Sequence, residues 1–514
     1  MTKRFRRDEL HCICALFCSL LLATPLVTQQ NLVTDPPQSP ASLTLAAVYD
    51  QQERHNAFSY AGKTDPPLIR VLPGETIEVR YVNNLPVHSD EKCALAFCKN
   101  MSNLHFHGLH VSPKNPQDDV LTMMAMPGEV LNYRVDVPFD APPGLYWYHT
   151  HPHEESARQD LDGMSGAIVI EGIDRYYPEV RDMLERVLIL RDRVIEDGDD
   201  RKKIQEQLEI PRDRCGTSTE QHLERVLTIN GAVRPQIPIR PGERQFWRIV
   251  NASPDRYVDI QMGGRQLEIV ALDGMPISYH DRSQGTLRVD HILIAPAGRV
   301  EAIVAGAAMH STLSTRCVDT GPDGDYNPAM VLADVASSPQ AAERERKVPG
   351  VRGPAIYKTF SSRQLETVKA QVPDFTVVFS EDKNGFYING KKFAMDSAPM
   401  LRAPVGSTQH WRVVNATREV HPFHIHQVHF LAYAINGVAS EMPEWLDTVN
   451  VPYGGTVDVW TFCAIDSETK LVPSFKVGKR THQALEIRLR LRNIELQQSI
   501  DRIAQLAFKS SNAA

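Results

Sequence analysis

Three stretches of the chain alternate apolar and polar residues between a glycine and an asparagine. They read PGETIEVRYVNN from Pro73, PGERQFWRIVNA from Pro241 and VGSTQHWRVVNA from Val405. In each stretch the glycine precedes the asparagine by nine residues. Alternation over this length is typical of a half-buried β-strand, while glycine suits the turn before a strand and asparagine suits its end. The pattern therefore predicts three equivalent strands.

A second turn signal lies shortly upstream of each of these strands and makes the pattern a repeat. The turns are YAGK from Tyr60, INGA from Ile229 and INGK from Ile388. An interval of about 165 residues indicates a repeated β-domain rather than a short solenoid repeat. Two more stretches, Leu267–Ile277 and Gly285–Val304, have strands separated by turns, as in a sandwich or barrel. We expect an all-β chain.

The segments between the repeats predict the domain organisation. A chain of 514 residues is too long for one core, since cores stop growing near about 250–300 residues. Residues 336–353 are polar and charged, which is typical of a linker, and 177–221 are charge-rich and partly helical. The predicted units begin with a signal peptide at 1–30, a first β-domain at 42–172 and a second β-domain at 173–335, which has 177–221 as an insertion. The linker at 336–353 follows, then a third β-domain at 354–492 that is atypical after 460, and a tail at 493–514.

The net charge of the chain and its N-terminal segment indicate which partners and which location to expect. The net charge of −7 argues against a general nucleic-acid binder, which would carry a basic field. The first 30 residues hold a basic start and an apolar run of 16 residues, Cys12–Val27, followed by polar sequence. This layout predicts a secretory signal peptide and an exported protein, periplasmic or extracellular, with an uncleaved anchor helix as the alternative. No later stretch is apolar enough to span a membrane.

Five cysteines lie beyond the predicted signal peptide, and their pairing is open. Cys93 and Cys98 are close enough in sequence to pair within one loop, but sequence cannot fix connectivity. The other three are Cys215, Cys317 and Cys463. An odd number leaves at least one thiol unpaired, so the chain is not a disulfide scaffold.

Histidines cluster in three motifs on the predicted strands. The motifs are NLHFHGLH with His105 and His107, YWYHTHPH with His149 and His151, and EVHPFHIHQVHF with His421, His424 and His426. Residues i and i+2 of a strand point to the same face, so each His-x-His pair can enter one metal site. Three pairs supply more imidazoles than one mononuclear site takes, so we expect a cluster of several metal ions between the first and third β-domains. Imidazole suits copper and zinc, and the lack of an acidic ligand motif nearby favours copper.

The motifs HFHG, WYHTH and HPFHIH, in this order on repeated β-domains, resemble those of the three-domain multicopper oxidases of the bacterial, laccase-like kind. The resemblance covers roughly Ser42 to Val459 and implies three cupredoxin-like Greek-key β-sandwich domains. It implies copper as the cofactor. A phenol-like or metal-ion reductant is oxidised at a type 1 copper, and its electrons reduce dioxygen to water at a trinuclear cluster.

The resemblance also implies a role for each histidine of the motifs. His105 and His424 match the ligands of a type 2 copper, and His421 matches the first histidine of a type 1 site. The positions that match type 3 ligands are His107, His149, His151 and His426.

An acidic residue and three further histidines complete the set of candidates. Asp118, with Asp119 as its rival, lies where relatives place an acid that relays protons. Such an acid fits a reaction that consumes protons. Three more histidines fall outside the family motifs HFHG, WYHTH and HPFHIH, and we interpret them as exposed or supporting residues: His110, His153 and His429.

The family's fourth motif, a His-Cys-His cluster near the C-terminus, is missing. The resemblance runs through Pro443–Trp460 and stops there, and the cysteine and histidine beyond it, Cys463 and His482, do not reproduce the motif. The type 1 site and two type 3 positions are therefore incomplete, and a blue-copper centre cannot form in its usual way without a cysteine thiolate.

Three explanations for the missing motif are open. In the first, the C-terminal sequence of an ordinary oxidase has been altered. In the second, the chain is a natural relative that has lost type 1 chemistry. In the third, a partner chain supplies the motif. The first predicts a copper-dependent oxidoreductase, and the second a catalytically inactive copper-binding relative. A structural β-protein with fortuitous histidines is a further alternative. Beyond Asn493 the apolar spacing predicts a short docking or oligomerisation helix, or a solvated end. Substrate and oligomeric state are left open.

Overall fold

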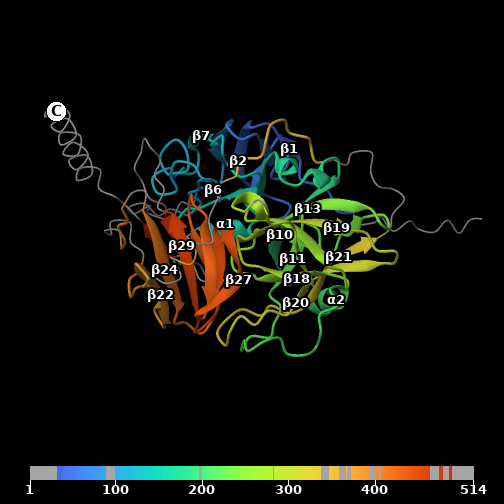
Figure 1. Ribbon diagram of the computed structural model, residues 1–514. Coiled ribbons are helices and arrows are strands. Elements are labelled where there is room, and N and C mark those ends of the chain that lie inside the picture. The colour runs from blue at the N-terminus through green and yellow to red at the C-terminus, as the bar shows by residue number, and fades with distance from the viewer. Residues whose placement is uncertain are drawn as a thin grey trace, which may run out of the picture.

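The computed structural model is built mainly of β-strands, which form six sheets (Figure 1). It describes residues 32–87, 99–153, 155–195, 200–281, 283–336, 346–357, 366, 372–392, 400–404, 407–462, 474–477 and 485–488. The predicted signal peptide and tail lie outside these residues, as do Cys93, Cys98, Cys463 and His482. The sheets share three main apolar cores, one for each pair of sheets, so the chain folds as three β-sandwiches. The predicted fold class is confirmed.

The first sandwich packs a sheet in the order β3-β2-β5-β7 on a sheet in the order β1-β4-β9-β8-β6. Strand β5 alternates as predicted, because Ile77, Val79 and Tyr81 are buried while Glu78 and Arg80 are exposed. The elements are β1 (Gln38–Ser39), β2 (Ser42–Asp50), β3 (His55–Ser59), β4 (Leu68–Val71), β5 (Thr76–Asn83), β6 (His105–His107), β7 (Val130–Asp136), β8 (Gly144–His149), α1 (Ser156–Leu161) and β9 (Ser165–Ile170).

The second sandwich packs a sheet in the order β11-β10-β13-β19-β15-β16, with β17 beside β15, on a sheet in the order β12-β21-β20-β14-β18. A disulfide joins Cys215 and Cys317 in this part of the chain. The strands are β10 (Leu184–Val194), β11 (Arg225–Ile229), β12 (Gln236–Pro238), β13 (Arg244–Asn251), β14 (Val258–Met262), β15 (Leu267–Leu272), β16 (Met275–Pro276), β17 (Leu287–Val289), β18 (His291–Ile294), β19 (Arg299–Ala305), β20 (Ser311–Arg316) and β21 (Met330–Ala336). The helices are α2 (Arg201–Gln207) and the short 3-10 turns η1 (Ile173–Arg175), η2 (Pro178–Val180) and η3 (Ile277–Tyr279).

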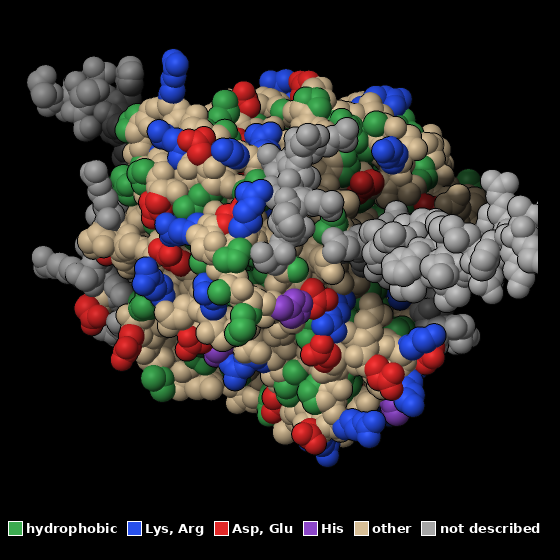
Figure 2. Space-filling view, turned by 90° about the vertical axis from the view of Figure 1, so that its right-hand side faces the viewer, with side chains coloured by type: hydrophobic (Ala, Val, Ile, Leu, Met, Phe, Trp, Pro, Cys, Tyr) green, Lys and Arg blue, Asp and Glu red, His purple; other side chains and the backbone are tan. Residues whose placement is uncertain are grey.

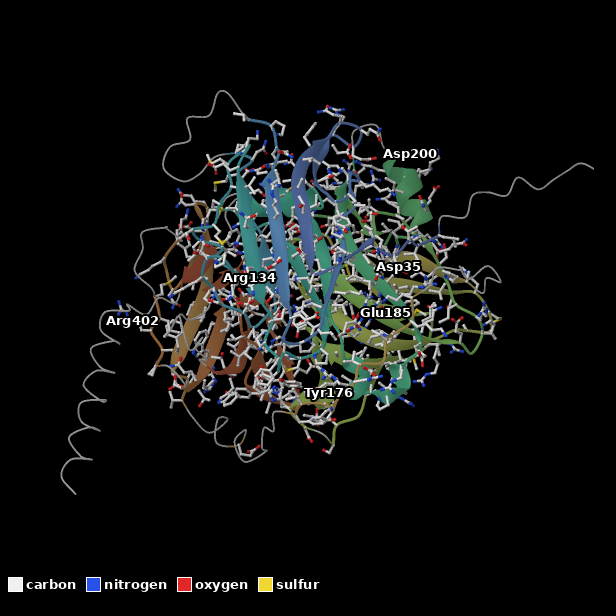
Figure 3. All side chains as sticks on the ribbon, turned by 90° about the horizontal axis from the view of Figure 1, so that it is seen from above. Asp35, Arg134, Tyr176, Glu185, Asp200 and Arg402 are labelled. Carbon is white, nitrogen blue, oxygen red and sulfur yellow. A yellow bond between two sulfur atoms is a disulfide. The ribbon has the colours of Figure 1, made fainter. Side chains whose placement is uncertain are left out.

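Strand β10 lies inside the charge-rich stretch 177–221, where the sequence indicated a partly helical insertion. Helix α2 is present, but β10 pairs in parallel with β13 and is an internal strand of its sheet. Three of its charged residues, Glu185, Arg186 and Asp192, are buried in ion pairs, which concealed the strand pattern. Glu185, labelled in the interior in Figure 3, accepts a hydrogen bond from Arg248 Nε at 2.6 Å and also pairs with Arg70 of the first sandwich.

The third sandwich packs a sheet in the order β23-β22-β24-β29-β26-β27 on a sheet in the order β28-β25-β30-β31. Its long strands lie on the left in Figure 1. The strands are β22 (Phe375–Asp382), β23 (Gly385–Ile388), β24 (Thr408–Asn415), β25 (His421–Ile425), β26 (Phe430–Ile435), β27 (Val438–Leu446), β28 (Thr448–Val451), β29 (Thr456–Phe462), β30 (Ser474–Val477) and β31 (Leu485–Arg488).

The three repeat asparagines end the equivalent strands β5, β13 and β24, as predicted. Asn83 Nδ2 donates to the carbonyls of Asn100 and Ala125, both at 2.8 Å. Asn251 and Asn415 likewise each donate to two backbone carbonyls of their own sandwich. Each buried amide therefore ties the end of its strand to two neighbouring segments, which gives the repeated asparagine a structural reason.

The surface carries mixed charge, in keeping with the modest net charge of the sequence. On the face drawn in Figure 2, basic and acidic side chains are interspersed and neither sign forms a large field. No helix among the described residues combines the length and the apolar character that crossing a membrane requires.

Candidate metal centre

Alternation along β25 divides the histidines of the third sandwich between two places. His421, Phe423 and Ile425 share one face of the strand, and Phe423 and Ile425 belong to the core of the third sandwich. His424 lies on the opposite face, and His426, just beyond the strand, lines the same cavity as His424. One short strand therefore directs its histidines to two separate places.

Strands β6 and β8 assemble the histidines of the first sandwich. Phe106 is buried in the core, so His105 and His107 on either side of it turn to the other face of β6. In the antiparallel ladder between β6 and β8, His105 lies opposite His149. The ring of His151 lies 5.4 Å from that of His105, between centroids. The two His-x-His pairs of the first sandwich therefore place their rings in the same region.

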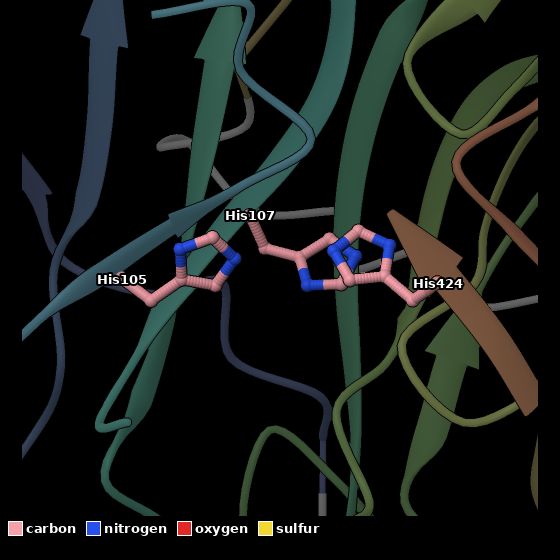
Figure 4. A group of neighbouring side chains, drawn as sticks. All are labelled: His105, His107 and His424. Carbon is pink, nitrogen blue, oxygen red and sulfur yellow. The ribbon is translucent and has the colours of Figure 1, made fainter. Parts of the chain in front are cut away.

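The six histidines of the three pairs converge where the first and third sandwiches meet. The rings of His107 and His424 stack with centroids 3.9 Å apart, and those of His105 and His426 with centroids 4.0 Å apart. Candidate ligand atoms of His105, His107 and His424 lie within 4.8 Å of one another (Figure 4). Nitrogen atoms at this spacing, supplied by the two strands β6 and β25, can share a metal ion.

The six histidines line a single cavity of about 70 Å³. The second sandwich also contributes to its wall, with Ser253, Pro254, Pro296 and Ala297. The site therefore lies at the junction of all three sandwiches, whereas the sequence predicted an interface of the first and third alone.

Hydrogen bonds at Nδ1 decide which ring nitrogen faces the cavity. Nδ1 of His424 donates to the Asp447 carbonyl at 2.7 Å, and Nδ1 of His149 donates to the Thr150 carbonyl at 2.9 Å. Because a carbonyl only accepts, Nε2 of both rings holds a lone pair. These two Nε2 atoms are buried and have no hydrogen-bond partner among the described residues. Buried lone pairs without partners are costly, and a metal ion would satisfy both.

Burial keeps the imidazoles in the form that binds metal. Burial is the main cause that lowers the pKa of His107 well below its usual range, and the neighbouring His424 lowers it further. The pKa of His426 is lowered in the same way, by burial first and then by the surrounding histidines. Neutral imidazoles offer their lone pairs at neutral pH, which a metal ligand requires.

Asp447, which directly follows β27, joins all three sandwiches at the cluster. Its carboxylate accepts from His107 Nε2 at 3.2 Å and from Arg299 Nη1 at 2.7 Å. Burial alone would raise the pKa of Asp447, but Arg299 and His107 outweigh it and hold the pKa well below its usual range. His107 is thereby left with Nδ1 to face the cavity. Gly108 has a φ of +84°, and a Cβ there would overlap Arg299 and Asp447, which explains the glycine of HFHG.

Asp118 lies against the cluster, whereas Asp119 does not. The Asp118 carboxylate accepts from His105 Nδ1 at 2.9 Å, from Gln427 Nε2 at 2.7 Å and from the backbone N–H of Phe106 at 2.9 Å. Burial raises the pKa of Asp118 to about 7, and the bonds from Phe106 and Gln427 limit the rise. Asp119 accepts bonds within its own turn. Of the two aspartates, only Asp118 therefore has the position of a proton-relaying acid.

His421 lies apart from the other six motif histidines. The rings of Phe379 and Phe386 pack edge-on against it, with centroids 5.8 and 5.6 Å away. Nε2 of His421 lies 3.6 Å from the Glu419 carboxylate. This histidine therefore sits among aromatic rings and an acid of its own sandwich, facing away from the cluster.

The surroundings of His421 include no thiolate in the part of the chain that the structure describes. A hollow of about 20 Å³ beside it is lined by Asp255 and Tyr257 of the second sandwich, among other residues, and none of them is a cysteine. The two cysteines within the described ranges, Cys215 and Cys317, are joined in the disulfide. Cys463 and His482 lie outside those ranges.

Asp447 and Arg299 were not among the site residues predicted from the sequence. A signal was present, because Asp447 is the one charged residue in the run LDTVNV of Leu446–Val451. A charge inside an otherwise buried strand pattern calls for a partner, but the sequence does not say which arginine provides it. The three histidines outside the motifs, His110, His153 and His429, do not line the cavity.

Comparison with known proteins agrees with this arrangement. Three family models, each described as multicopper oxidase, match residues 44–174, 146–312 and 364–464. A multicopper oxidase of Staphylococcus aureus is 23% identical over 388 residues, which are 74% of this chain and 72% of that protein. A laccase of Bacillus subtilis (strain 168) is 24% identical over 404 residues, 73% of this chain and 74% of that protein.

Solved structures share the fold. A multicopper oxidase from Campylobacter jejuni, described as a metallo-oxidase, has a TM-score of 0.65 at 21% identity and covers 90% of this chain and 96% of its own. The McoA multicopper oxidase from Aquifex aeolicus has a TM-score of 0.67 at 15% identity, over 90% of this chain and 100% of its own. The chain belongs to the multicopper oxidases of the bacterial, laccase-like kind, a family of copper-dependent oxidoreductases, and copper is its cofactor.

Proposed function

We propose that this protein binds copper with the six converging histidines and couples oxidation of a phenol-like or metal-ion reductant to reduction of dioxygen to water. The observation that carries the proposal is the convergence itself: the rings of His107 and His424, from the first and third sandwiches, stack 3.9 Å apart in one cavity. Two His-x-His pairs in one sandwich and a third in another are hard to explain by packing alone.

In the proposed reaction the residues around the cluster have distinct tasks. Bound copper supplies the capacity to accept electrons and to bind dioxygen. The Asp447 carbonyl and carboxylate orient His424 and His107, and Arg299 holds Asp447 in place. Asp118 holds a proton at its carboxylate beside His105, where the reduction of dioxygen consumes protons.

A second candidate function is a copper-binding relative without oxidase activity. The observation that favours it is the neighbourhood of His421, which offers no cysteine within the described ranges. Without a thiolate, a reductant has no type 1 copper through which to deliver electrons. The third family match also ends at residue 464, close to where the resemblance stops.

Copper content and visible absorption of the purified full-length protein show which copper sites are present, and dioxygen uptake with a phenol separates the two candidates. An oxidase with all its sites should bind roughly four copper ions per chain and absorb strongly in the visible range through its thiolate ligand. The described residues predict fewer ions and a colourless protein. A chain that binds no copper would contradict both candidates.

We also propose that the protein is exported. The basic start and the 16-residue apolar run of the N-terminal segment support this location. Detection of the mature chain in the periplasmic or extracellular fraction would test it, and a chain that stays in the cytoplasm would contradict it.

A further inference from the structure

A second cavity, of about 180 Å³, lies between the second and third sandwiches. Leu272, Met275 and Ile277 form its wall on the side of the second sandwich, and Leu431 and Trp445 form its wall on the side of the third. None of the histidines of the cluster lines it. A cavity of about 150 Å³ with apolar walls is large enough for benzene, so this one has room for a single substituted ring.

The walls of this cavity suit an aromatic molecule with one polar group. The rings of His280 and Trp445 stack with centroids 4.0 Å apart, which presents flat aromatic surface. The thioethers of Met275 and Met442 add polarizable contacts that favour aromatic rings. Glu444 also lines the cavity, and burial raises the pKa of its carboxyl group. An exposed acid, Asp281, lines the cavity as well, and mainly apolar walls with a few polar groups are typical of a small-molecule site.

The cavity is linked to the cluster through its own wall on both sides. Trp445 is two residues before Asp447, whose carbonyl accepts from His424 Nδ1 and whose carboxylate accepts from His107 Nε2. On the other side, Leu272 directly precedes Asp273, whose carboxylate accepts the backbone N–H of Asp447 at 3.0 Å. From Trp445 to the ring of His424 the path consists of covalent bonds and one hydrogen bond.

We propose that this cavity binds a small phenol and that Trp445 passes the electron of the phenol toward the copper held by His107 and His424, without a type 1 site. The proposal rests on the proposed copper oxidase function and names the class of its reductant. It gives the cluster an electron entry that does not depend on the surroundings of His421.

The step balances for one electron and one proton. The phenol O–H bond breaks, its proton forms an O–H bond with the Glu444 carboxylate, and a phenoxyl radical remains. Trp445 gives up one electron toward the copper, which is the oxidant and becomes reduced, and regains one electron from the phenol. Dioxygen, reduced to water at the cluster, is the final acceptor.

Binding is tested on the copper-free full-length chain, with 2-methoxyphenol as the probe and isothermal titration calorimetry as the readout. The probe should bind at one site. Gln284→Trp at the exposed rim should weaken binding by about tenfold or more, because the indole fills the space of the probe. Gln266→Trp, a matched change at an exposed residue away from the cavity, should leave binding unchanged. No binding, or equal affinity in Gln284→Trp and wild type, overturns the site.

The electron route is tested with Trp445→Phe in the copper-loaded protein. Phenylalanine keeps an apolar ring in the wall, so KM and the affinity of the copper-free variant should stay within about threefold of wild type, while kcat falls about tenfold or more. Trp411→Phe, a buried tryptophan of the same sandwich outside the cavity, should keep its kcat. An unchanged kcat in Trp445→Phe, or a loaded wild type that binds the phenol without oxidising it, overturns the route. If the wild type takes up no copper, the proposed function fails, while the calorimetry on the copper-free chain still decides the binding site.

Discussion

The two faces of strand β25 differ in how completely their histidines are supported. On one face His424 joins five other motif histidines, its Nδ1 is held by the Asp447 carbonyl, and its Nε2 points to a shared cavity. On the other face His421 has two phenylalanine rings and the Glu419 carboxylate as neighbours, and no further motif histidine.

The difference shows that a histidine motif on one strand indicates a metal site only when the strands that face it also supply ligands. His424 is completed by β6 and β8 of the first sandwich, which the sequence also marks with histidines. His421 would need the fourth motif, for which no matching sequence is found after Trp460. The same five-residue strand therefore carries one histidine of the assembled site and one histidine of a site that is not assembled among the described residues.

The largest effect is expected when the histidine on the cluster face of β25 is replaced. His424→Ala should weaken copper binding by at least about a hundredfold, since even the loss of a group that supports a ligand costs about ten- to a hundredfold. His421→Ala should leave copper binding by the cluster unchanged. Copper bound after dialysis against a chelator series, measured by atomic absorption, checks both variants.

His410→Ala serves as the control, because His410 is buried and hydrogen-bonded to Asp458 but lies outside the cluster. Equal copper loss in the His421 and His424 variants would mean that the two faces of β25 do not act separately.

The second prediction concerns the support of the cluster. Asp447→Asn should weaken copper binding by about ten- to a hundredfold, because an uncharged amide neither holds Arg299 nor orients His107 as a carboxylate does. It should also lower the midpoint of thermal unfolding, since it removes the closer of the two carboxylates that balance the buried Arg299 and leaves only Asp273.

The matched control for this variant is Glu268→Gln, which removes the partner of the partly exposed Arg244 and should have little effect on either measurement. Wild-type copper affinity in Asp447→Asn would show that His107 does not need the Asp447 carboxylate to be held in place.

The third and smallest effect on copper is expected in the second sandwich. Replacing both Cys215 and Cys317 with serine removes a cross-link between residues 102 positions apart. It should cost roughly 2–5 kcal/mol in the free energy of unfolding. Copper binding at the cavity should not change, because neither residue lines it. Denaturant unfolding and copper content of the same preparation test this, and loss of copper would mean that the disulfide supports the cluster.

Alternation and repetition made much of the fold predictable. The nine-residue spacing from glycine to asparagine located β5, β13 and β24, because a strand between a turn and a terminal asparagine leaves a local sequence signal. Strand β10 was less visible, since its charged residues Glu185 and Asp192 are buried against arginines from distant parts of the chain. A local sequence pattern cannot show that a charged residue is buried and neutralised by a residue far away in the chain.

The candidate site likewise has one part that the sequence predicts and one part that it does not. The His-x-His pairs could be found from the sequence, because two residues that are two positions apart on a strand point to the same face. Asp118 was reached through the family resemblance, and its bond to His105 is now visible. Asp447 and Arg299 meet only in the folded chain, 148 positions apart, so no local signal could pair them.

Copper K-edge X-ray absorption of the copper-loaded full-length protein shows directly which atoms bind the copper. We infer that copper binds on the face of β25 that carries His424, with imidazole ligands and no thiolate. The expected result is a first shell of nitrogen or oxygen with the outer-shell pattern of imidazole rings. A copper–sulfur scattering path, or a first shell without imidazole, would contradict it.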